Sequence, residues 1–421
     1  MQASAHLSQR QILVLVAVLG GVFSLGALAT DLYQPGLPTM ADDLGIGTRS
    51  AQMTITALLA GLALGQLAAG PLSDSLGRRR PLLVGLALFV ASSIVCAVAP
   101  SALILTIARV VQGMAAAAGV ALGNAVVTDY FRDREAARVL SRLVLVSYIV
   151  PVLAPLVGSV VLRLTSWRGL FVTMAIVGAV LLMAVAVGLR ESLPRQRRAP
   201  ADTRALLKTL ADLRHDRGFV GLTLSAALMY GAFFAYLTGV SFVMQRQYGA
   251  SPLLFSVLFS VNALGMMAAS QLNHMLLARL APRTLHAAGL SGCLLAGTGA
   301  LIVAALPGTS LLALEVPLFA LVFCVGLATP DVTALALSRH PNVAGSAAAG
   351  FGTVRLGLAS ATTPLVGIGG TVAAVPMAAV MVASSAGALA ALAAVWRRVG
   401  GAEPAAATLA PAETAEDVAV G

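Results

Sequence analysis

Long apolar runs occupy most of the chain, and short breaks rich in charge, proline or glycine separate them. Each run is close to the roughly 20 mostly apolar residues that a membrane-spanning helix needs. We predict twelve such helices, at residues 11–38, 51–73, 81–99, 101–129, 136–163, 168–189, 219–246, 253–279, 285–306, 309–337, 343–372 and 375–396. The runs lack the strict alternation of a transmembrane β-strand. The pattern therefore predicts an all-α, multi-pass membrane protein.

One long polar segment, residues 191–217, divides the chain. It predicts an N-terminal six-helix bundle at 1–190, a cytoplasmic central loop at 191–217 and a C-terminal six-helix bundle at 218–399. Within the loop, residues 205–213 have the pattern of a short amphipathic helix on the membrane surface. The tail at 400–421 is rich in Ala, Glu and Pro, a composition that predicts disorder.

The two halves repeat weakly. GALATDLYQ at residues 26–34 aligns with GAFFAYLTG at residues 231–239, and other stretches align at a similar offset near 205 residues. This alignment places Tyr236 over Asp31 and Glu315 over Arg109. Two like-oriented, pseudo-symmetric halves are typical of a transporter whose substrate site lies between them at mid-membrane.

The net charge of +10 could indicate a nucleic-acid partner, but its placement argues against one. Most Arg and Lys residues fall in the central loop and in the other loops on one side of the predicted helices. The opposite loops hold only Arg49, Arg163, Arg168 and Arg246. This positive-inside bias predicts that the central loop and both termini lie in the cytoplasm.

Several chemistries lack support in the sequence. Cys96, Cys293 and Cys324 fall within apolar runs and fit small packing residues. There is no GxxxxGK[ST] phosphate loop, no His/Cys cluster for a metal and no soluble domain for a cofactor. We therefore expect neither an enzyme nor a metal or cofactor site.

Asp31 follows a long uncharged stretch, where a carboxylate costs roughly 2.5–3.5 kcal/mol. It lies seven residues from the outer end of its helix near Pro38, and Arg109 lies eight residues from the outer end of its own helix near Ser101. At about 1.5 Å per residue the two side chains have similar depth. Desolvation favours the neutral carboxyl group and a nearby guanidinium favours the charged one, so Asp31 could load and release a proton. The alternative is a permanent structural ion pair.

The stretch GPLSDSLGRRRPLL, residues 70–83, ends the second predicted helix. Gly70 and Gly77 would allow close helix approach and a tight turn. The carboxylate of Asp74 could accept from the N-terminus of a neighbouring helix, and Arg78 and Arg79 would hold the loop in the cytoplasm. A plain positive-inside turn is the alternative.

This stretch resembles the loop signature of the major facilitator superfamily. LTIARVVQGMAAAAG (105–119) resembles its helix 4 signature in proton-coupled drug exporters, and SYIVPVLAPLVGSVV (147–161) resembles the helix 5 signature of its antiporters. DLYQPGLP, LSDSLGRRRP and SWRGLF resemble the Bcr/CflA drug-resistance branch. The resemblance covers roughly residues 11–397; Ser75, Ala154 and Ser159 depart from it.

The resemblance implies proton coupling at Asp31 and Arg109. It implies conformational roles for Gly70, Asp74, Gly77, Arg78, Arg79, Gln112, Gly113, Pro155 and Gly158. Pro155 would bend its helix, and Gly158 would let that helix pack tightly against its counterpart in the other half. An ordinary kinked helix is the alternative.

A substrate cavity also needs apolar bulk and a few polar contacts. The candidates are Tyr33, Gln34, Asn124, Tyr148, Tyr230, Phe233, Phe234, Tyr236, Asn262, Asp331 and Arg355. We expect Asp331 and Arg355 to form an ion pair, either as part of substrate choice or as a structural link.

With this resemblance, the leading hypothesis is a monomeric drug/proton antiporter of the bacterial cytoplasmic (inner) membrane that exports small amphiphilic compounds by alternating access. Its partners would be a small drug-like substrate, protons and the lipid bilayer. A proton-coupled uptake symporter on the same fold is the alternative, and a polytopic sensor or lipid-modifying enzyme is a third possibility.

Overall fold

The computed structural model describes residues 9–131, 133–198, 203–367 and 373–399. Within these ranges it contains helices and no strand, so the predicted all-α class is confirmed. The tail predicted to be disordered and Arg132 lie outside the described residues.

The first half holds nine elements. They are α1 (Gln9–Phe23), α2 (Leu25–Asp31), the 3-10 turn η1 (Gln34–Gly36), α3 (Leu37–Asp43), α4 (Thr48–Leu76), α5 (Arg79–Ala97), α6 (Ala102–Tyr130), α7 (Asp133–Leu164) and α8 (Trp167–Gly188). The segment between the halves holds the 3-10 turn η2 (Arg195–Arg197) and α9 (Thr203–Leu213).

The second half holds the remaining elements. They are α10 (Arg217–Phe242), the π-helical turn η3 (Val243–Gln247), α11 (Pro252–Leu276), α12 (Pro282–Ala305), α13 (Leu311–Leu337), the 3-10 turns η4 (Pro341–Val343) and η5 (Thr363–Gly367), α14 (Ala344–Thr362) and α15 (Ala374–Val399).

Among the described residues, ten helices are long and apolar enough to cross a membrane, or eleven if α1 and the bent segment Leu25–Asp43 count as one span. The remaining helical segment of the twelve predicted is α14, whose sequence is rich in Gly, Ala, Ser and Thr and carries Arg355. The chain is therefore a multi-pass membrane protein.

The first predicted helix, 11–38, is broken rather than continuous. Its two parts are bent by 48° at Ser24, whose hydroxyl donates to the carbonyl oxygen of Gly20 at 2.7 Å. The prolines do not end the segment, because Pro35 and Pro38 occupy the first turns of η1 and α3, where proline is tolerated. The helical path therefore continues to Asp43.

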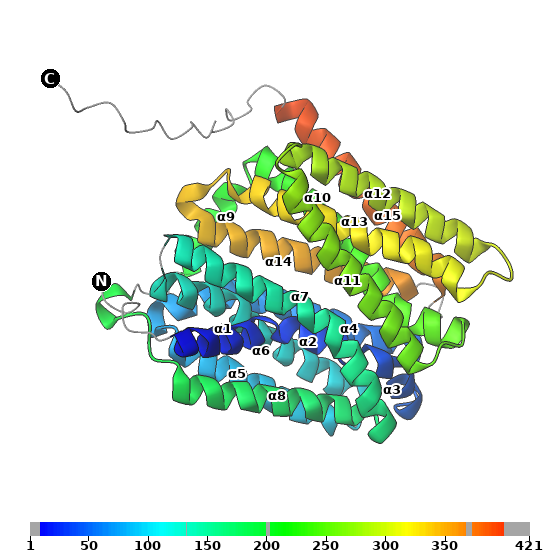
Figure 1. Ribbon diagram of the computed structural model, residues 1–421, viewed down its shortest axis with the longest axis horizontal. Helices are drawn as coiled ribbons and strands as arrows, with labels where there is room; N and C mark the ends of the chain where they lie inside the picture. Colours follow the sequence, from blue (N-terminus) through cyan, green and yellow to red (C-terminus); the bar gives the residue numbers. More distant parts are fainter. Residues whose placement is uncertain (1–8, 132, 199–202, 368–372, 400–421) are drawn as a thin grey trace.

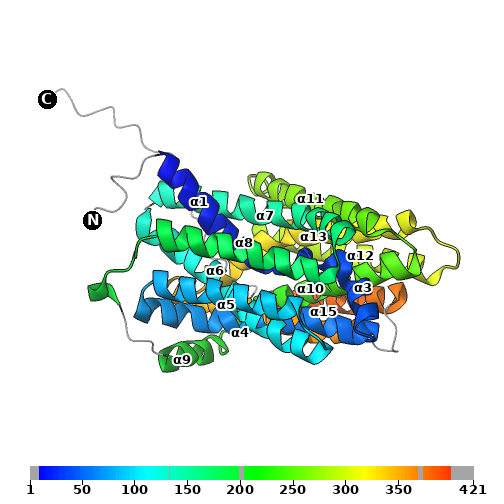
Figure 2. The ribbon, with the colours of Figure 1, turned by 90° about the horizontal axis from the view of Figure 1, so that it is seen from below.

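The helices form two bundles that lie one above the other in Figure 1. Helices α1 to α8 pack on one another in the lower bundle, and α10 to α15 in the upper one. Contacts between the bundles come mainly from α4 against α14 and from α7 against α11. Figure 2 shows α9 at one end of the elongated molecule, beside the bundle.

We call this end the arginine-rich end. It carries the turn between α4 and α5, the turn after α6, the segment between α8 and α10, and the turns after α11 and α13. These connections hold most of the basic residues of the chain. The start of α1, α9 and the end of α15 lie toward it in Figure 1.

Glycine allows the backbones of α4 and α6 to touch. A Cβ atom added at Gly61 would overlap the backbone oxygen of Val110, and one added at Gly113 would overlap that of Leu58. Close approach at small residues is a main source of helix association in membranes. This seam fixes α6, and with it Arg109 and Gln112, against α4.

Candidate functional site

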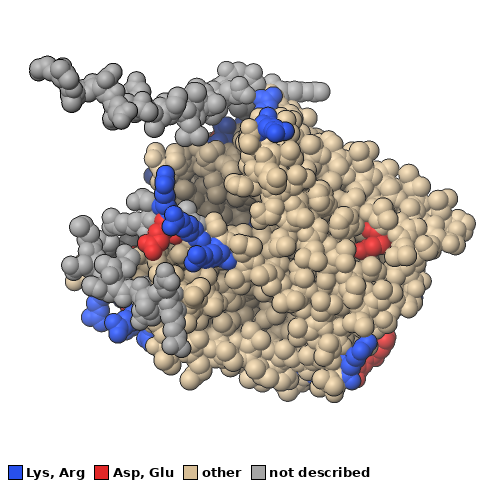
Figure 3. Space-filling view, viewed as in Figure 1, with Lys and Arg blue, Asp and Glu red and all other residues tan. Residues whose placement is uncertain are grey.

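A cavity of about 770 Å³ lies between the two bundles at the arginine-rich end. Helices α4 and α6 line it on one side, and α13, η4 and α14 on the other. Thr209 of α9 also lines it. Figure 3 shows the molecule hollowed between the two bundles near this end. The size and the position between two halves suit a small-molecule substrate.

Hydrogen bonds join the two bundles at the opposite end of the molecule. The side-chain amide of Gln34 donates to the backbone oxygen of Leu237 at 2.9 Å, and the Ser241 hydroxyl donates to that of Gln34 at 2.6 Å. Gln245 donates to Pro35 at 3.2 Å, and Arg246 donates to Pro38 at 3.0 Å. The structure is therefore closed at this end while the cavity opens at the arginine-rich end.

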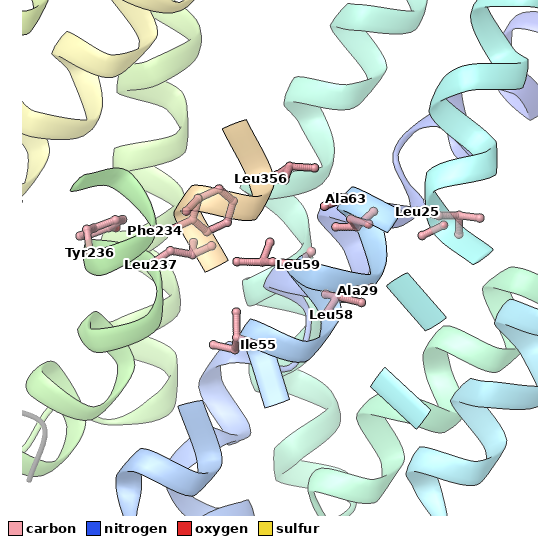
Figure 4. Close-up of a cluster of buried hydrophobic side chains, with 14 of the residues drawn as sticks. Leu25, Ala29, Ile55, Leu58, Leu59, Ala63, Phe234, Tyr236, Leu237 and Leu356 are labelled. Atoms are coloured by element: carbon pink, nitrogen blue, oxygen red, sulfur yellow. The ribbon is translucent and has the colours of Figure 1, made fainter. Parts of the chain in front are cut away.

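An apolar layer continues this closure toward the cavity. Figure 4 shows Ile55 and Leu59 of α4 facing Leu237 of α10, with Phe234 and Leu356 beside them. All five side chains are buried. The layer blocks a continuous aqueous path between the two ends.

Asp31 ends α2 and is 5% exposed. Among the described residues, no ion pair or hydrogen bond is formed by its carboxyl group. The Arg109 guanidinium, fully buried, instead donates to the backbone oxygen of Ala29 at 2.9 Å and to Gln112 Oε1 at 2.7 Å. Arg109 thus reaches the turn of Asp31, as the depth argument predicted, but the alternative of a permanent ion pair is wrong for this conformation.

Aromatic and amide groups complete the Arg109 environment. Its guanidinium carbon lies 4.3 Å from the centre of the Tyr33 ring, and the Tyr33 hydroxyl shares a hydrogen bond of 2.7 Å with Thr54. Gln112 donates to the Ser93 hydroxyl at 2.7 Å. The sequence analysis did not identify Thr54 and Ser93. Both are polar residues within predicted apolar helices, and that feature could have indicated them.

A second polar cluster lies in the other bundle. Asn262 of α11 donates to the Tyr236 hydroxyl at 2.9 Å, and the Glu315 carboxyl group of α13 lies beside Asn262. Glu315 is 8% exposed, and neither carboxyl oxygen has a hydrogen-bond partner in the described structure. Tyr236 and Glu315, which the repeat places over Asp31 and Arg109, thus both lie next to Asn262.

The predicted ion pair between Asp331 and Arg355 does not form in this structure. Asp331 is buried and accepts from the Asn273 amide at 2.5 Å. Arg355 instead lies over the Tyr230 ring, 4.3 Å from its centre. Asp331 and Arg355 were expected to pair because of their similar depth, but depth alone does not determine the direction in which each side chain points.

Few of the predicted substrate contacts line the cavity. Asn124 and Arg355 do, and sequence reasoning missed Gln66 and Phe351. The others lie outside its lining: Tyr33, Gln34, Tyr148, Tyr230, Phe233, Phe234, Tyr236, Asn262 and Asp331. Tyr148 shares a hydrogen bond of 3.2 Å with Ser270 between α7 and α11, and Tyr230, Phe233, Phe234 and Tyr236 form a ring cluster along α10.

Ion pairs stabilise the loop between α4 and α5. Asp74 accepts from Arg78 at 2.5 Å, and Arg78 also donates to Asp129 of α6 at 3.2 Å. The expectation that Asp74 accepts from a neighbouring helix N-terminus is not met here, although the first residues of α14 line the same cavity. Gly77 has φ +91°, which glycine tolerates in this turn.

The remaining motif residues lie in different surroundings. Arg79 donates to the backbone oxygen of Ala186 at 2.7 Å. Gly70 has open space around it, so the expected close helix approach there is wrong. Pro155 lies within the continuous helix α7, and a Cβ atom at Gly158 would overlap the backbone oxygen of Leu32. Gly158 therefore permits packing within its own half, not against the other half as expected.

Two six-helix bundles around a cavity that is open at one end define a membrane transporter. The chain belongs to the Major Facilitator Superfamily, whose sequence model matches residues 18–364. It is a family of transporters and not of enzymes.

Relatives and solved structures agree with this assignment. The chain is 36% identical over 371 residues to the uncharacterized MFS-type transporter YdgK of Bacillus subtilis (strain 168), covering 88% of this chain and 92% of that protein. It is 28% identical over 362 residues to a bicyclomycin resistance protein homolog of Haemophilus influenzae, covering 85% and 90%. The crystal structure of a D-xylose-proton symporter shares the fold, with TM-score 0.71 and 16% identity over 93% of this chain and 98% of that one.

Proposed function

We propose that this protein is a proton-coupled exporter of small amphiphilic compounds that works by alternating access in the bacterial cytoplasmic membrane. The name of its bicyclomycin resistance relative supports a drug-like cargo. The resemblance of residues 105–119 and 147–161 to exporter and antiporter signatures, and of several stretches to the Bcr/CflA branch, supports the direction.

The positive-inside bias supports a cytoplasmic location for the arginine-rich end and for both termini. With that orientation, the 770 Å³ cavity opens to the cytoplasm and the hydrogen bonds of Gln34, Ser241 and Gln245 close the outer side. The structure then corresponds to the inward-facing state, which accepts cargo from the cytoplasm or the inner leaflet.

The observation that carries proton coupling is the buried, unpaired carboxyl group of Asp31. A buried carboxylate without a counter-ion is costly, whereas the neutral group is tolerated. Asp31 would take a proton when the outer side is open, as cargo leaves. It would release the proton to the cytoplasm as new cargo enters. The guanidinium of Arg109, which reaches from α6 to the backbone oxygen of Ala29 in α2, would favour the charged form.

The membrane potential is sufficient to drive such exchange. One proton crossing about 100 mV gains about 2.3 kcal/mol. At 1.4 kcal/mol per decade this supports a gradient of roughly fifty-fold for a neutral substrate. A pH gradient would add to it.

The test is substrate-induced proton release from purified protein, measured with a panel of small amphiphilic compounds that includes chloramphenicol, bicyclomycin and 1-naphthoate. We expect release by the wild type and none by Asp31→Asn. Glu135→Gln, at an exposed position of α7, is the matched control and should behave as the wild type. Unchanged release by Asp31→Asn would contradict the role of this residue.

Cellular accumulation tests the direction of transport. An exporter lowers the accumulation of its substrate in cells that produce it, whereas the uptake symporter raises it. If a compound that releases protons from the purified protein accumulates to a higher level in these cells, the result would contradict export and support uptake.

A further inference from the structure

Arg355 is a cation at the deep end of the cavity. It lies eleven residues beyond Ala344, the first residue of α14, which corresponds to about 16 Å along the helix axis. Its guanidinium carbon is 4.3 Å from the centre of the Tyr230 ring and 5.8 Å from that of Phe351. Two aromatic rings therefore hold the planar group in place by cation–π contact.

No carboxylate balances this charge within the described structure. Arg355 forms no ion pair there, and its buried Nε atom has no hydrogen-bond partner. The nearest candidate by sequence, Asp331, is engaged by Asn273. The faces of the two rings, over which the guanidinium lies, offer it no acceptor oxygen.

The other cation along the cavity, Arg78, is paired with carboxylates. The ionisable lining residues are Asp74, Arg78 and Arg355, so two cations face one carboxylate. Asp74 and Arg78 are paired at 2.5 Å, and Arg78 is also paired with Asp129. The cavity therefore has a single unbalanced positive charge among its described lining residues, far from its mouth. A cleft with low-dielectric walls concentrates ions of the opposite sign.

We propose that the cargo carries a carboxylate or a similar oxyanion, and that Arg355 binds this group. The inference rests on the proposed transport function and narrows its substrate class. A guanidinium matches the two oxygens of a carboxylate with parallel N–H donors. Gln66, Asn124 and Thr333 line the same cavity and supply further polar contacts, while Phe351 offers an apolar surface. The cargo is thus an amphiphilic organic anion.

Binding to purified protein tests this directly. The probes are benzoate, 1-naphthoate and indole-3-acetate, each compared with its uncharged methyl ester. The wild type should bind at least one carboxylate roughly ten-fold more tightly than its ester, as expected for a charge-assisted bidentate contact. Arg355→Gln should lose this preference while keeping its affinity for the ester, which also reports that the site is folded. Arg355→Lys should retain part of it.

Two control variants separate direct binding by Arg355 from an indirect effect of its charge. Arg142→Gln removes an exposed arginine of α7 and should leave the preference unchanged. Asp331→Asn tests whether Arg355 acts through a pair formed in another conformation; loss of the preference in this variant would overturn direct recognition. Equal affinity of the wild type and Arg355→Gln for the carboxylates, or no carboxylate binding at millimolar concentration, would also overturn it.

The outcome is distinguishable from failure of the proposed function. If the carboxylate preference depends on Arg355 but no compound releases protons, the result supports the binding site and contradicts proton coupling. If neutral compounds cause proton release that depends on Asp31 and no carboxylate preference exists, the result supports proton coupling and contradicts an anionic cargo.

Discussion

Uncharged groups hold the buried Arg109 of the first bundle. Its donors reach the backbone oxygens of Ala29 and Thr54 and the side chain of Gln112, and its flat face lies against Tyr33. Guanidinium offers several donors in one plane, which a lysine at the same position could not reproduce. This arrangement leaves the neighbouring carboxyl group of Asp31 without a fixed partner, which is what a proton-exchanging group requires.

Asp216, at the arginine-rich end, shows the opposite arrangement. It caps α10 and accepts from Arg339 at 2.8 and 2.9 Å and from the backbone N–H of Gly218 at 2.8 Å. Burial alone would raise the pKa of Asp216, but hydrogen bonds from Arg339, Gly218 and Phe219 lower it to about 2. Asp216 therefore ties the start of α10 to the end of α13.

We predict that Asp216→Asn lowers stability at neutral pH by about 1 kcal/mol, because the side chain is partly exposed and solvent screens the pair. Since the folded pKa is lowered from 3.8, the stabilisation is present above pH 4 and is lost as the pH falls toward 2. Thermal unfolding should show that the melting temperature of the wild type approaches that of the variant as the pH is lowered from 7 to 3. A difference in melting temperature that stays constant across this pH range would contradict the stabilising role of the Asp216 carboxylate. Asp212→Asn, at an exposed position of α9, is the control.

At the scale of helices, the glycines of α4 have different roles. Gly61 faces the backbone of α6, whereas Gly70 faces open space. The sequence predicted close helix approach at Gly70 and made no such prediction for Gly61, so the sequence alone did not identify the glycine at the close contact. The distinction depends on how α4 is rotated, which the contacts of the folded bundle decide.

We predict opposite effects of alanine at Gly113 of α6 and Gly70 of α4. Gly113→Ala should destabilise the protein, because its Cβ atom would overlap the backbone oxygen of Leu58 and force α4 and α6 apart. Gly70→Ala should stabilise it by about 0.5–1 kcal/mol, since alanine is the better helix former and meets no neighbour. Denaturant unfolding in lipid or detergent measures both. Equal effects of the two substitutions would show that the α4–α6 seam is not a close contact.

Helix positions were largely predictable because an apolar run of membrane length has few alternative structures. The predicted run 101–129 lies within one residue of α6 at each end, and the run 375–396 lies within α15. The bend at Ser24 and the end of α14 at Thr362 were not predicted. The first depends on a side-chain bond to Gly20, and the second precedes Pro364, which cannot donate the next helical hydrogen bond.

The candidate site was less predictable than the helices. The similar depth of Asp31 and Arg109 was predictable from their positions in their helices, but their contacts depend on packing between α2, α4 and α6. Arg355 lines the cavity as predicted, yet its partner is Tyr230 instead of Asp331. Contacts between the bundles also depend on which end is open, and that state is a property of the assembled molecule.

At the scale of the whole molecule, the two ends are joined by different interactions. The opposite end is closed by neutral hydrogen bonds from Gln34, Ser241 and Gln245, together with the pair of Arg246 and Asp42. The arginine-rich end holds its charges within each bundle, as in the pairs of Arg78 with Asp74 and of Arg339 with Asp216. An alternating-access cycle must break the first set.

These hydrogen bonds allow the equilibrium between the two states to be shifted by mutation. Replacing both Ser241 and Gln245 by alanine removes donors that cross to Gln34 and Pro35. At about 0.6 kcal/mol per hydrogen bond in a membrane protein, the change is about 1.2 kcal/mol. This corresponds to a shift of roughly seven-fold toward the outward-open state.

Spin labels at Leu164, the last residue of α7, and Leu306, the first residue after α12, would measure this shift, because both are exposed at the opposite end of their bundles. We predict that the double variant increases the population with a longer distance between the labels. Ser291→Ala is the matched control, because the Ser291 hydroxyl donates only within α12, to Ala287. An unchanged distance distribution in the double variant would mean that these bonds do not hold the opposite end closed. The closure would then rest on the apolar layer around Leu59 and Leu237, and the outward-open state would have to separate those side chains first.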